Sequence, residues 1–164
     1  MVHVIRKLND ATELHRLRLQ LAAETKNMMF EIDEVPSVKE TALQLGRLEK
    51  IPHGTAFGAY VGSSLVGFIT LERGRVRRNN GIGILVMGIL QSCSGRGIGH
   101  NLMSSSIAWA KNEGLYRLSF DVRADNYRAL ELYDRLGFEI EGKMKHAALI
   151  DGELVDKYLM AMLM

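Results

Sequence analysis

The sequence contains few of the residues that build cross-linked or metal-centred folds. Its single cysteine, Cys93, cannot form an internal disulfide, and its five histidines are too widely spaced for a Cys/His zinc pattern. We therefore expect no metal site and a reducing compartment. Proline occurs only twice, and no repeat or linker-like segment divides the chain, so the sequence predicts one domain over residues 1–164.

Long apolar runs and a strong charge of either sign are also missing. The longest nearly apolar stretch, residues 81–90, is far shorter than a membrane span. Residues 1–7 become charged before an apolar segment of secretory length develops. These features predict a soluble, cytoplasmic protein with no membrane partner. With 21 Lys and Arg against 19 Asp and Glu, the net charge of +2 does not favour nucleic acid as a partner.

The apolar residues follow helix and strand periods in turn. They belong to a chain that is 47% hydrophobic, which is enough to bury a core. Helices are expected at residues 10–21, 37–50, 98–114 and 126–136, and strands at 2–4, 55–71 (two, meeting at a turn over 62–64), 84–90, 116–122 and on both sides of 151–152. The order β-α-α-β-β-β-α-β-α-β-β predicts an α/β fold, with a single mixed, largely antiparallel central sheet of about seven strands flanked by about four helices.

Glycine is abundant, at 16 of 164 residues against a usual share of roughly 7%. Three glycines alternate in Ser94-Gly95-Arg96-Gly97-Ile98-Gly99, which joins a buried strand to a helix. Because a helix start offers unpaired N–H groups and glycines admit a bulky anion, the segment predicts a phosphate or pyrophosphate site. A tight turn without a ligand is the alternative. His100 replaces the third glycine of a dinucleotide fingerprint, and the Gly-Lys-Ser/Thr of a Walker loop is missing.

A second motif lies on the expected helix at residues 126–136. Asn126, Ala129 and Tyr133 are spaced by three and four residues, so they share one helix face. An amide, a small residue and a phenol beside an anion site could hold a long, thin ligand. The alternative is that Tyr133 packs in the core with its hydroxyl at the rim.

Together the two motifs resemble the GNAT superfamily of acetyl-CoA-dependent N-acetyltransferases. The resemblance rests on the glycine segment 94–99 and on Asn126-x-x-Ala129-x-x-x-Tyr133-x-x-x-Gly137-Phe138, in the right order and at the right distance. The expected element order also matches, and residues 109–111, 139–142 and 151–156 are in the style of bacterial members.

The resemblance implies a binding site for acetyl-CoA as co-substrate. In such a site the glycine loop holds the pyrophosphate, the preceding strand binds the pantetheine arm, and Asn126 and Tyr133 lie along that arm. Ser94 departs from the usual Arg or Gln, so Arg96 could compensate, and Arg123 or Arg128 could meet the 3′-phosphate. The implied cofactor-binding residues are Gly88, Ile89, Leu90, Ser94, Gly95, Arg96, Gly97, Ile98, Gly99, Asn126, Ala129 and Tyr133.

Acetyl transfer to an amine requires a polarised carbonyl, an acid and a base. We expect a backbone N–H near Ile89 or Leu90 to polarise the thioester carbonyl. Tyr133 is the candidate acid, because a phenol with a pKa of about 10 is protonated at neutral pH. Glu72, at the end of the third strand, is the candidate base; the alternative is that it is a surface carboxylate beside Arg73 and Arg75.

The acceptor is less defined by the sequence. Residues 24–36 carry four carboxylates and Met28, Met29 and Phe30, and could form an acidic, apolar-backed wall for a cationic amine. A solvated connection whose apolar residues pack on the core is equally consistent. The arginine cluster 73–78 favours exposed charge or a homodimer contact over nucleic-acid binding. No histidine is paired with Cys93, so covalent catalysis is not favoured.

The leading interpretation is an N-acetyltransferase that acts by direct attack in a ternary complex. Its acceptor would be a primary amine on a small molecule, a protein N-terminus or a lysine. The alternative is a non-catalytic CoA-binding sensor or regulatory module. A doubly wound nucleotide-binding protein is disfavoured, because the last two strands form a hairpin rather than a crossover.

Overall fold

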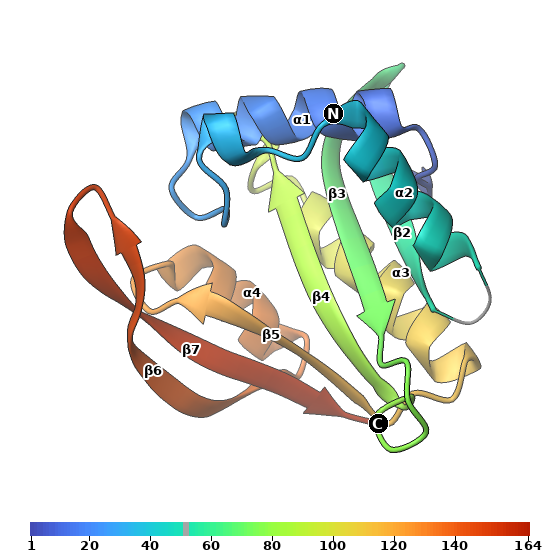
Figure 1. Ribbon diagram of the computed structural model, residues 1–164, viewed down its shortest axis with the longest axis vertical. Coiled ribbons are helices and arrows are strands. Elements are labelled where there is room, and N and C mark those ends of the chain that lie inside the picture. Colours follow the sequence, from blue (N-terminus) through green and yellow to red (C-terminus); the bar gives the residue numbers. More distant parts are fainter. Residues whose placement is uncertain (51–52) are drawn as a thin grey trace.

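The computed structural model describes residues 1–50 and 53–164 (Figure 1). The described residues form a seven-stranded sheet and four α-helices. The strands are β1 (Val4–Lys7), β2 (Gly54–Val61), β3 (Ser64–Arg73), β4 (Ile82–Ile89), β5 (Arg117–Arg123), β6 (Glu139–Ile150) and β7 (Glu153–Leu163). The helices are α1 (Ala11–Glu24), α2 (Val38–Glu49), α3 (Ile98–Asn112) and α4 (Tyr127–Arg135), with 3₁₀ turns η1 (Ile32–Glu34) and η2 (Gln91–Cys93).

The sheet is mixed, and one seam in it is short. Its strand order is β1-β2-β3-β4-β5-β7-β6, and every neighbouring pair is antiparallel except β4 with β5. The parallel pairing of β4 and β5 covers only three residues of each strand, Ile82–Ile84 against Arg117–Ser119. Beyond this point the two strands diverge, and Figure 1 shows the resulting V between them.

Helices cover both faces of the sheet. α1 and α2 pack on β2, β3 and β4 from one side, which we call the front face, and α3 packs on β1 to β4 from the other. Figure 1 looks onto the front face, with α3 and α4 behind the strands. α1 and α3 contribute buried apolar stripes to the core, which include Leu14, Leu17 and Leu21 of α1 and Ile98, Leu102 and Met103 of α3.

Local capping explains where several helices begin. The side chain of Asp10 accepts a hydrogen bond of 3.0 Å from the N–H of Glu13, which starts α1. Ser37 and Glu40 form a reciprocal capping box at the start of α2. Both signals were read correctly from the sequence, because capping depends on neighbours three residues apart.

The predicted fold class and element order are confirmed, with small differences in the bounds. β1 begins at Val4 rather than at residue 2, and β4 covers Ile82–Ile89 instead of 84–90. The segment 91–93 adds a 3₁₀ turn that periodicity did not predict. Such differences are expected, because strand ends depend on hydrogen bonds to neighbouring strands.

No helix among the described residues has the length and apolar character needed to cross a membrane. Within the same residues, no three His, Cys, Asp or Glu side chains come together in a way that could hold a metal ion.

Candidate active site

The divergence of β4 from β5 leaves one edge of β4 without a partner strand. In an antiparallel pair, alternate residues direct both backbone groups to the partner. The N–H of Leu90 donates to Val66 at 2.9 Å and the carbonyl of Ile82 accepts from Gly74 at 3.0 Å, so even-numbered residues of β4 face β3. The backbone groups of Met87 and Ile89 therefore face the opening toward β5.

This alternation corrects one expectation drawn from the sequence. The N–H of Leu90 is committed to Val66 and is not available to a ligand in the gap. Gly88 also directs its backbone to β3, and a Cβ there would come within 2.7 Å of Leu21, so its lack of a side chain serves packing under α1. Ile89 remains a candidate donor, and Met87 is a second one that the sequence analysis missed.

The glycine segment lies at the end of β4, before the first turn of α3. Gly95 and Gly97 have φ values of 76° and 78°, which favour glycine, and Gly97 is the N-cap of the helix. A Cβ on Gly97 would meet no atom within 4 Å, so this side of the helix start is open. Ser94 directs its hydroxyl to the carbonyl of Leu90 at 3.4 Å, and Ile98 is buried in the core. The geometry suits an anion at the α3 N-terminus.

Gly99 plays a different part from the other two glycines. It is buried, and a Cβ there would lie 2.8 Å from Leu132 of α4 and 3.2 Å from Ile89. The absence of a side chain therefore lets α3 approach α4 and β4 closely.

Three arginines were possible partners for phosphate, and the structure places them in different surroundings. Arg128 of α4 reaches over the loop so closely that its guanidinium would collide with a Cβ on Gly95. Arg123 is held by Asp125 through two hydrogen bonds of 2.9 and 2.8 Å. Arg96 is exposed and lies 3.5 Å from the sulfur of Met1. Arg128 is thus the guanidinium best placed over the glycine loop.

A hollow of about 440 Å³ lies beside Arg128, between the end of β5 and the connection after α1. Its lining residues are Lys26, Asn27, Arg123, Asp125, Asn126, Tyr127 and Arg128. Asn126 caps α4 by accepting a hydrogen bond of 3.3 Å from the N–H of Ala129, so its carbonyl oxygen has a structural role. The amide nitrogen of Asn126 is left for the hollow.

Tyr133 lies on the inner face of α4, next to the point where β4 and β5 part. Only 8% of the residue is exposed, and its ring makes an edge contact with Phe120 at a centroid distance of 4.4 Å. Phe120 follows directly after Ser119, the last residue of β5 in register with β4. Burial raises the pKa of Tyr133 to about 12, so the phenol stays protonated at neutral pH. None of the hydrogen bonds within the described residues uses its hydroxyl.

Glu72 lies on the front face, at the closed end of the V. It is in register with Ile84, and its carboxylate pairs with Arg75 at 2.6 Å. The side chain is 47% exposed. Asp121 of β5 is another carboxylate on this face; it pairs with Lys157 at 2.8 Å. The sequence analysis did not single out Asp121. The alternation of polar and apolar residues along this strand nevertheless predicts that Asp121 lies on the opposite face of the sheet from Phe120 and Val122.

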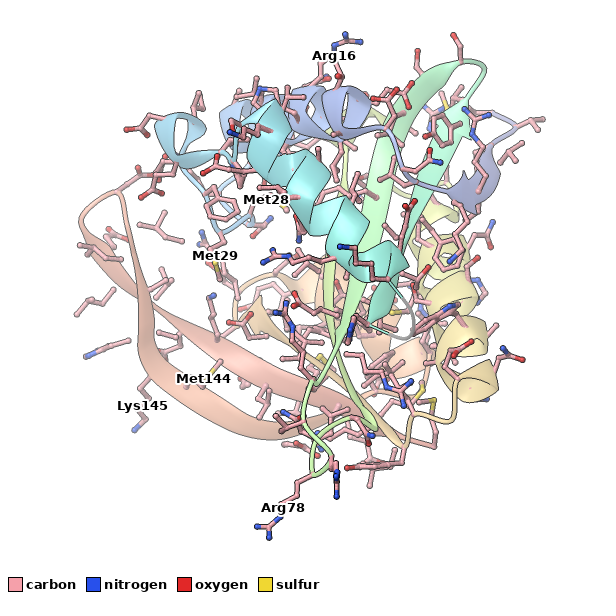
Figure 2. The ribbon with its side chains drawn as sticks, turned by 45° about the vertical axis from the view of Figure 1, so that its right-hand side comes forward. Arg16, Met28, Met29, Arg78, Met144 and Lys145 are labelled. Carbon is pink, nitrogen blue, oxygen red and sulfur yellow. The ribbon has the colours of Figure 1, made fainter. Side chains whose placement is uncertain are left out.

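Two of the four carboxylates in the connection between α1 and α2 are engaged in local contacts. Glu24 accepts a hydrogen bond of 2.7 Å from the N–H of Gln91, and Glu31 pairs with Lys26 at 3.3 Å. Met28 packs against the core, whereas Met29 is 74% exposed. Figure 2 shows both methionines on the side of the molecule that faces the β6–β7 hairpin. Glu24 and Glu31 thus serve local contacts, and the thioether of Met28 lies beside Gly88 of β4.

Two other candidates have simple structural explanations. Cys93 is buried in the core, which is consistent with a packing role. In the arginine cluster 73–78, Arg75 pairs with Glu72 and Arg73 donates to the carbonyl of Asn80, while Arg78 projects into solvent (Figure 2).

Comparison with known proteins identifies relatives over most of the chain. The sequence model described as "Acetyltransferase (GNAT) family" matches residues 19–138. The L-amino acid N-acetyltransferase AaaT of Escherichia coli is 32% identical over 104 residues, which cover 63% of this chain and 64% of that protein. The N-alpha-acetyltransferase RimI of Mycobacterium tuberculosis is 32% identical over 110 residues, which cover 66% of each chain. The matches thus span just under two thirds of either relative.

Solved structures agree over nearly the whole chain. An acetyltransferase of the GNAT family from Streptococcus pneumoniae superposes with a TM-score of 0.94 at 27% identity, covering 99% of this chain and 100% of the other. A phosphinothricin acetyltransferase from Sinorhizobium meliloti, solved in complex with AcCoA, gives a TM-score of 0.87 at 18% identity and covers 100% and 89%. The second likeness concerns the fold alone.

Proposed function

This chain belongs to the acetyltransferase (GNAT) family, and from that premise we propose that it transfers acetyl from acetyl-CoA to a primary amine by direct attack in a ternary complex. The observation that carries the proposal is the unpartnered edge of β4 beside a glycine-lined helix start. Few binding modes other than an extended, diphosphate-bearing arm would use both features at once. The printed names of the relatives cover amino acid and N-alpha acceptors, so the acceptor needs an argument of its own.

The backbone of β4 would bind the pantetheine arm as an added strand. Met87 and Ile89 direct N–H and carbonyl groups into the gap, and their positions are fixed by the pairing of the alternate residues with β3. A donor held in this way can polarise the thioester carbonyl without reorganising, which is the condition for effective stabilisation of developing negative charge.

The phosphates would be held at the start of α3. The open N–H groups after Gly97 and the positive end of the helix dipole favour an anion there. Ser94 supplies no charge where the family usually has Arg or Gln, and Arg128 reaches the same loop from α4. We therefore assign to Arg128 the compensating charge, which the sequence suggested for Arg96.

Tyr133 would donate the proton that the departing thiol requires. During transfer the amine nitrogen forms a bond to the acetyl carbon while the carbon–sulfur bond breaks. One proton leaves the amine for the base and the sulfur takes a proton from the phenol; the base then releases its proton to water, and water returns one to the phenolate, so that no net proton is gained or lost. The raised pKa of Tyr133 keeps that proton available at neutral pH.

Glu72 is our proposal for the base, acting through water. It lies on the front face, where the amine would enter, because α3 covers the opposite face of β4. Glu72 is in register with Ile84, which precedes Met87 by three residues on β4. This separation favours proton transfer through water over direct transfer from the amine to Glu72.

The proposal is tested by calorimetry and by thiol release. We expect acetyl-CoA to bind to the purified chain, and at least one amine from a panel of amino acids, amino acid amides and polyamines to cause release of free thiol. Binding without release for any amine would refute catalysis and support the CoA-binding sensor instead. Absence of binding at millimolar acetyl-CoA would refute both.

A further inference from the structure

Arg18 is a buried arginine without a counter-charge. It lies on α1 with 8% of its surface exposed, and its guanidinium carbon is 5.3 Å from the centroid of Phe68. Nη2 donates to Oε1 of Gln44 at 2.8 Å, but Nη1 is buried with no hydrogen-bond partner. No carboxylate among the described residues forms a salt bridge with it. Because a buried, unpaired charge is costly, this arrangement indicates a missing anion.

The guanidinium lies close to the proposed site of transfer. Phe68 is in register with Gly88 of β4, and one edge of its ring would be 3.0 Å from a Cβ on Gly88. Gly88 stands between Met87 and Ile89, whose backbone groups face the gap. Arg18 is therefore about one strand away from the bound thioester, on the face from which the amine would enter.

Next to this point, β4 exposes apolar side chains although it is an interior strand. Val86 is 48% exposed and Ile84 is 57% exposed. Both lie on the same front face as Gly88, and Figure 1 shows no helix in front of this part of β4. Apolar groups on an interior strand are usually covered, so these two indicate an apolar occupant.

Two other pairs of charged groups on this face compensate each other within the protein. Asp121 pairs with Lys157 at 2.8 Å, and Arg117 donates to Glu141 at 2.7 Å. An acceptor with a cationic side chain would therefore have no free carboxylate to pair with at Asp121 or Glu141. Arg18 differs because its positive charge has no such partner.

On the basis of the proposed function, we propose that the acceptor is an α-amino acid with an apolar side chain, whose carboxylate pairs with Arg18 and whose side chain covers Val86 and Ile84. An α-amino acid carries its carboxylate on the carbon next to the amine, which suits a guanidinium so near the thioester. Nη1 is covered in this structure, so pairing requires a local side-chain movement.

The experiment measures kcat/KM for L-leucine, L-leucinamide and glycine with saturating acetyl-CoA, by thiol release from the full chain. L-Leucine and L-leucinamide differ in the carboxylate, and L-leucine and glycine differ in the apolar side chain. We expect L-leucine to exceed each of the other two at least tenfold.

Variants then separate recognition from folding, because the ratio of two acceptors is compared within one protein. Arg18→Met should reduce the preference for L-leucine over L-leucinamide at least tenfold, and Arg18→Lys should restore part of it. Arg16→Met is the matched control, because Arg16 lies on the same helix but points away from the sheet (Figure 2); it should leave both ratios unchanged. Val86→Asp should remove the preference for L-leucine over glycine.

The outcomes distinguish this inference from the proposed function. If L-leucinamide equals L-leucine, or if Arg18→Met slows both acceptors equally, the carboxylate assignment is overturned while acetyl transfer stands. If glycine equals L-leucine, the apolar assignment is overturned. If no amine in the wider panel releases thiol, the function itself fails, and the acceptor with it.

Discussion

Replacing Tyr133 with phenylalanine tests the chemistry of the site while leaving its packing intact. The variant loses one hydroxyl that makes no hydrogen bond within the described residues. It keeps the edge contacts with Phe120 and Phe138, at centroid distances of 4.4 and 6.3 Å. We therefore expect the free energy of unfolding to change by no more than about 1 kcal/mol.

The expected loss of activity is much larger than the change in stability. A positioned general acid contributes ~10²-fold or more, which corresponds to about 2.7 kcal/mol of the barrier. Because the pKa of Tyr133 is raised to about 12, the wild-type protein should not lose this acid below that pH. The rate of the variant should be low throughout the neutral range.

The assay follows thiol release under saturating acetyl-CoA, and calorimetry gives the dissociation constant in parallel. Tyr133→Phe should lower kcat ~10²-fold while the affinity for acetyl-CoA stays within about threefold. Tyr158→Phe, on β7, is the matched control and should retain full activity. A kcat for Tyr133→Phe within threefold of wild type would exclude the phenol as the acid.

Stability measurements give an independent check on the buried phenol. Its pKa is higher in the folded state than in the unfolded chain, where it is about 10. The stability associated with the protonated phenol is therefore complete below pH 10 and is lost as the pH rises toward 12. Tyr133→Phe should weaken this alkaline loss, and an identical pH dependence in both proteins would contradict the assigned burial.

Three further predictions follow from the site. Arg128→Ala should raise the KM for acetyl-CoA about tenfold, as expected for a lost phosphate contact of about 1.4 kcal/mol. Arg135→Ala, at an exposed position on the same helix, is the control and should leave this KM unchanged. If the two variants have the same KM for acetyl-CoA, Arg128 does not contact the phosphates. Glu72→Gln should displace the acidic limb of the pH–rate profile, and an unmoved profile would remove Glu72 as the base. Gly97→Ala should lower the free energy of unfolding by about 1–2 kcal/mol, because the φ of 78° is unfavourable for alanine. Gly46→Ala is the control: Gly46 lies inside α2 with open space around it, so the change should not lower the free energy of unfolding. Thermal or urea unfolding measures both effects.

The sequence predicted the order of elements because that order rests on local signals. Capping residues such as Asp10 and Ser37, and the alternation of apolar residues along β5, depend on neighbours a few residues apart. The two motifs that resemble the family also lie in short segments, which is why the glycine loop and Tyr133 could be proposed as site residues from the sequence alone.

Long-range geometry explains what the sequence could not provide. The backbone of Leu90 faces β3 and that of Met87 faces the gap, and only the register with β3 determines this alternation. The position of Arg128 over Gly95 joins residues 33 apart in the sequence, and the burial of Arg18 depends on α2 and β3. Contacts of this kind leave no periodic trace in the sequence.

The short parallel pairing between β4 and β5 divides the molecule into two lobes that can move relative to one another. Three register pairs, the close approach of Gly99 to Leu132 and the contacts of Lys26 with Asp151 and Arg123 link the two lobes. The large lobe is built on β1 to β4, and the small lobe comprises β5 to β7 and α4. A molecule lodged in the V touches both lobes and acts as a clamp across the hinge. Deuterium uptake in β5 and α4 should then slow when the gap is filled, although neither element gains a new strand partner.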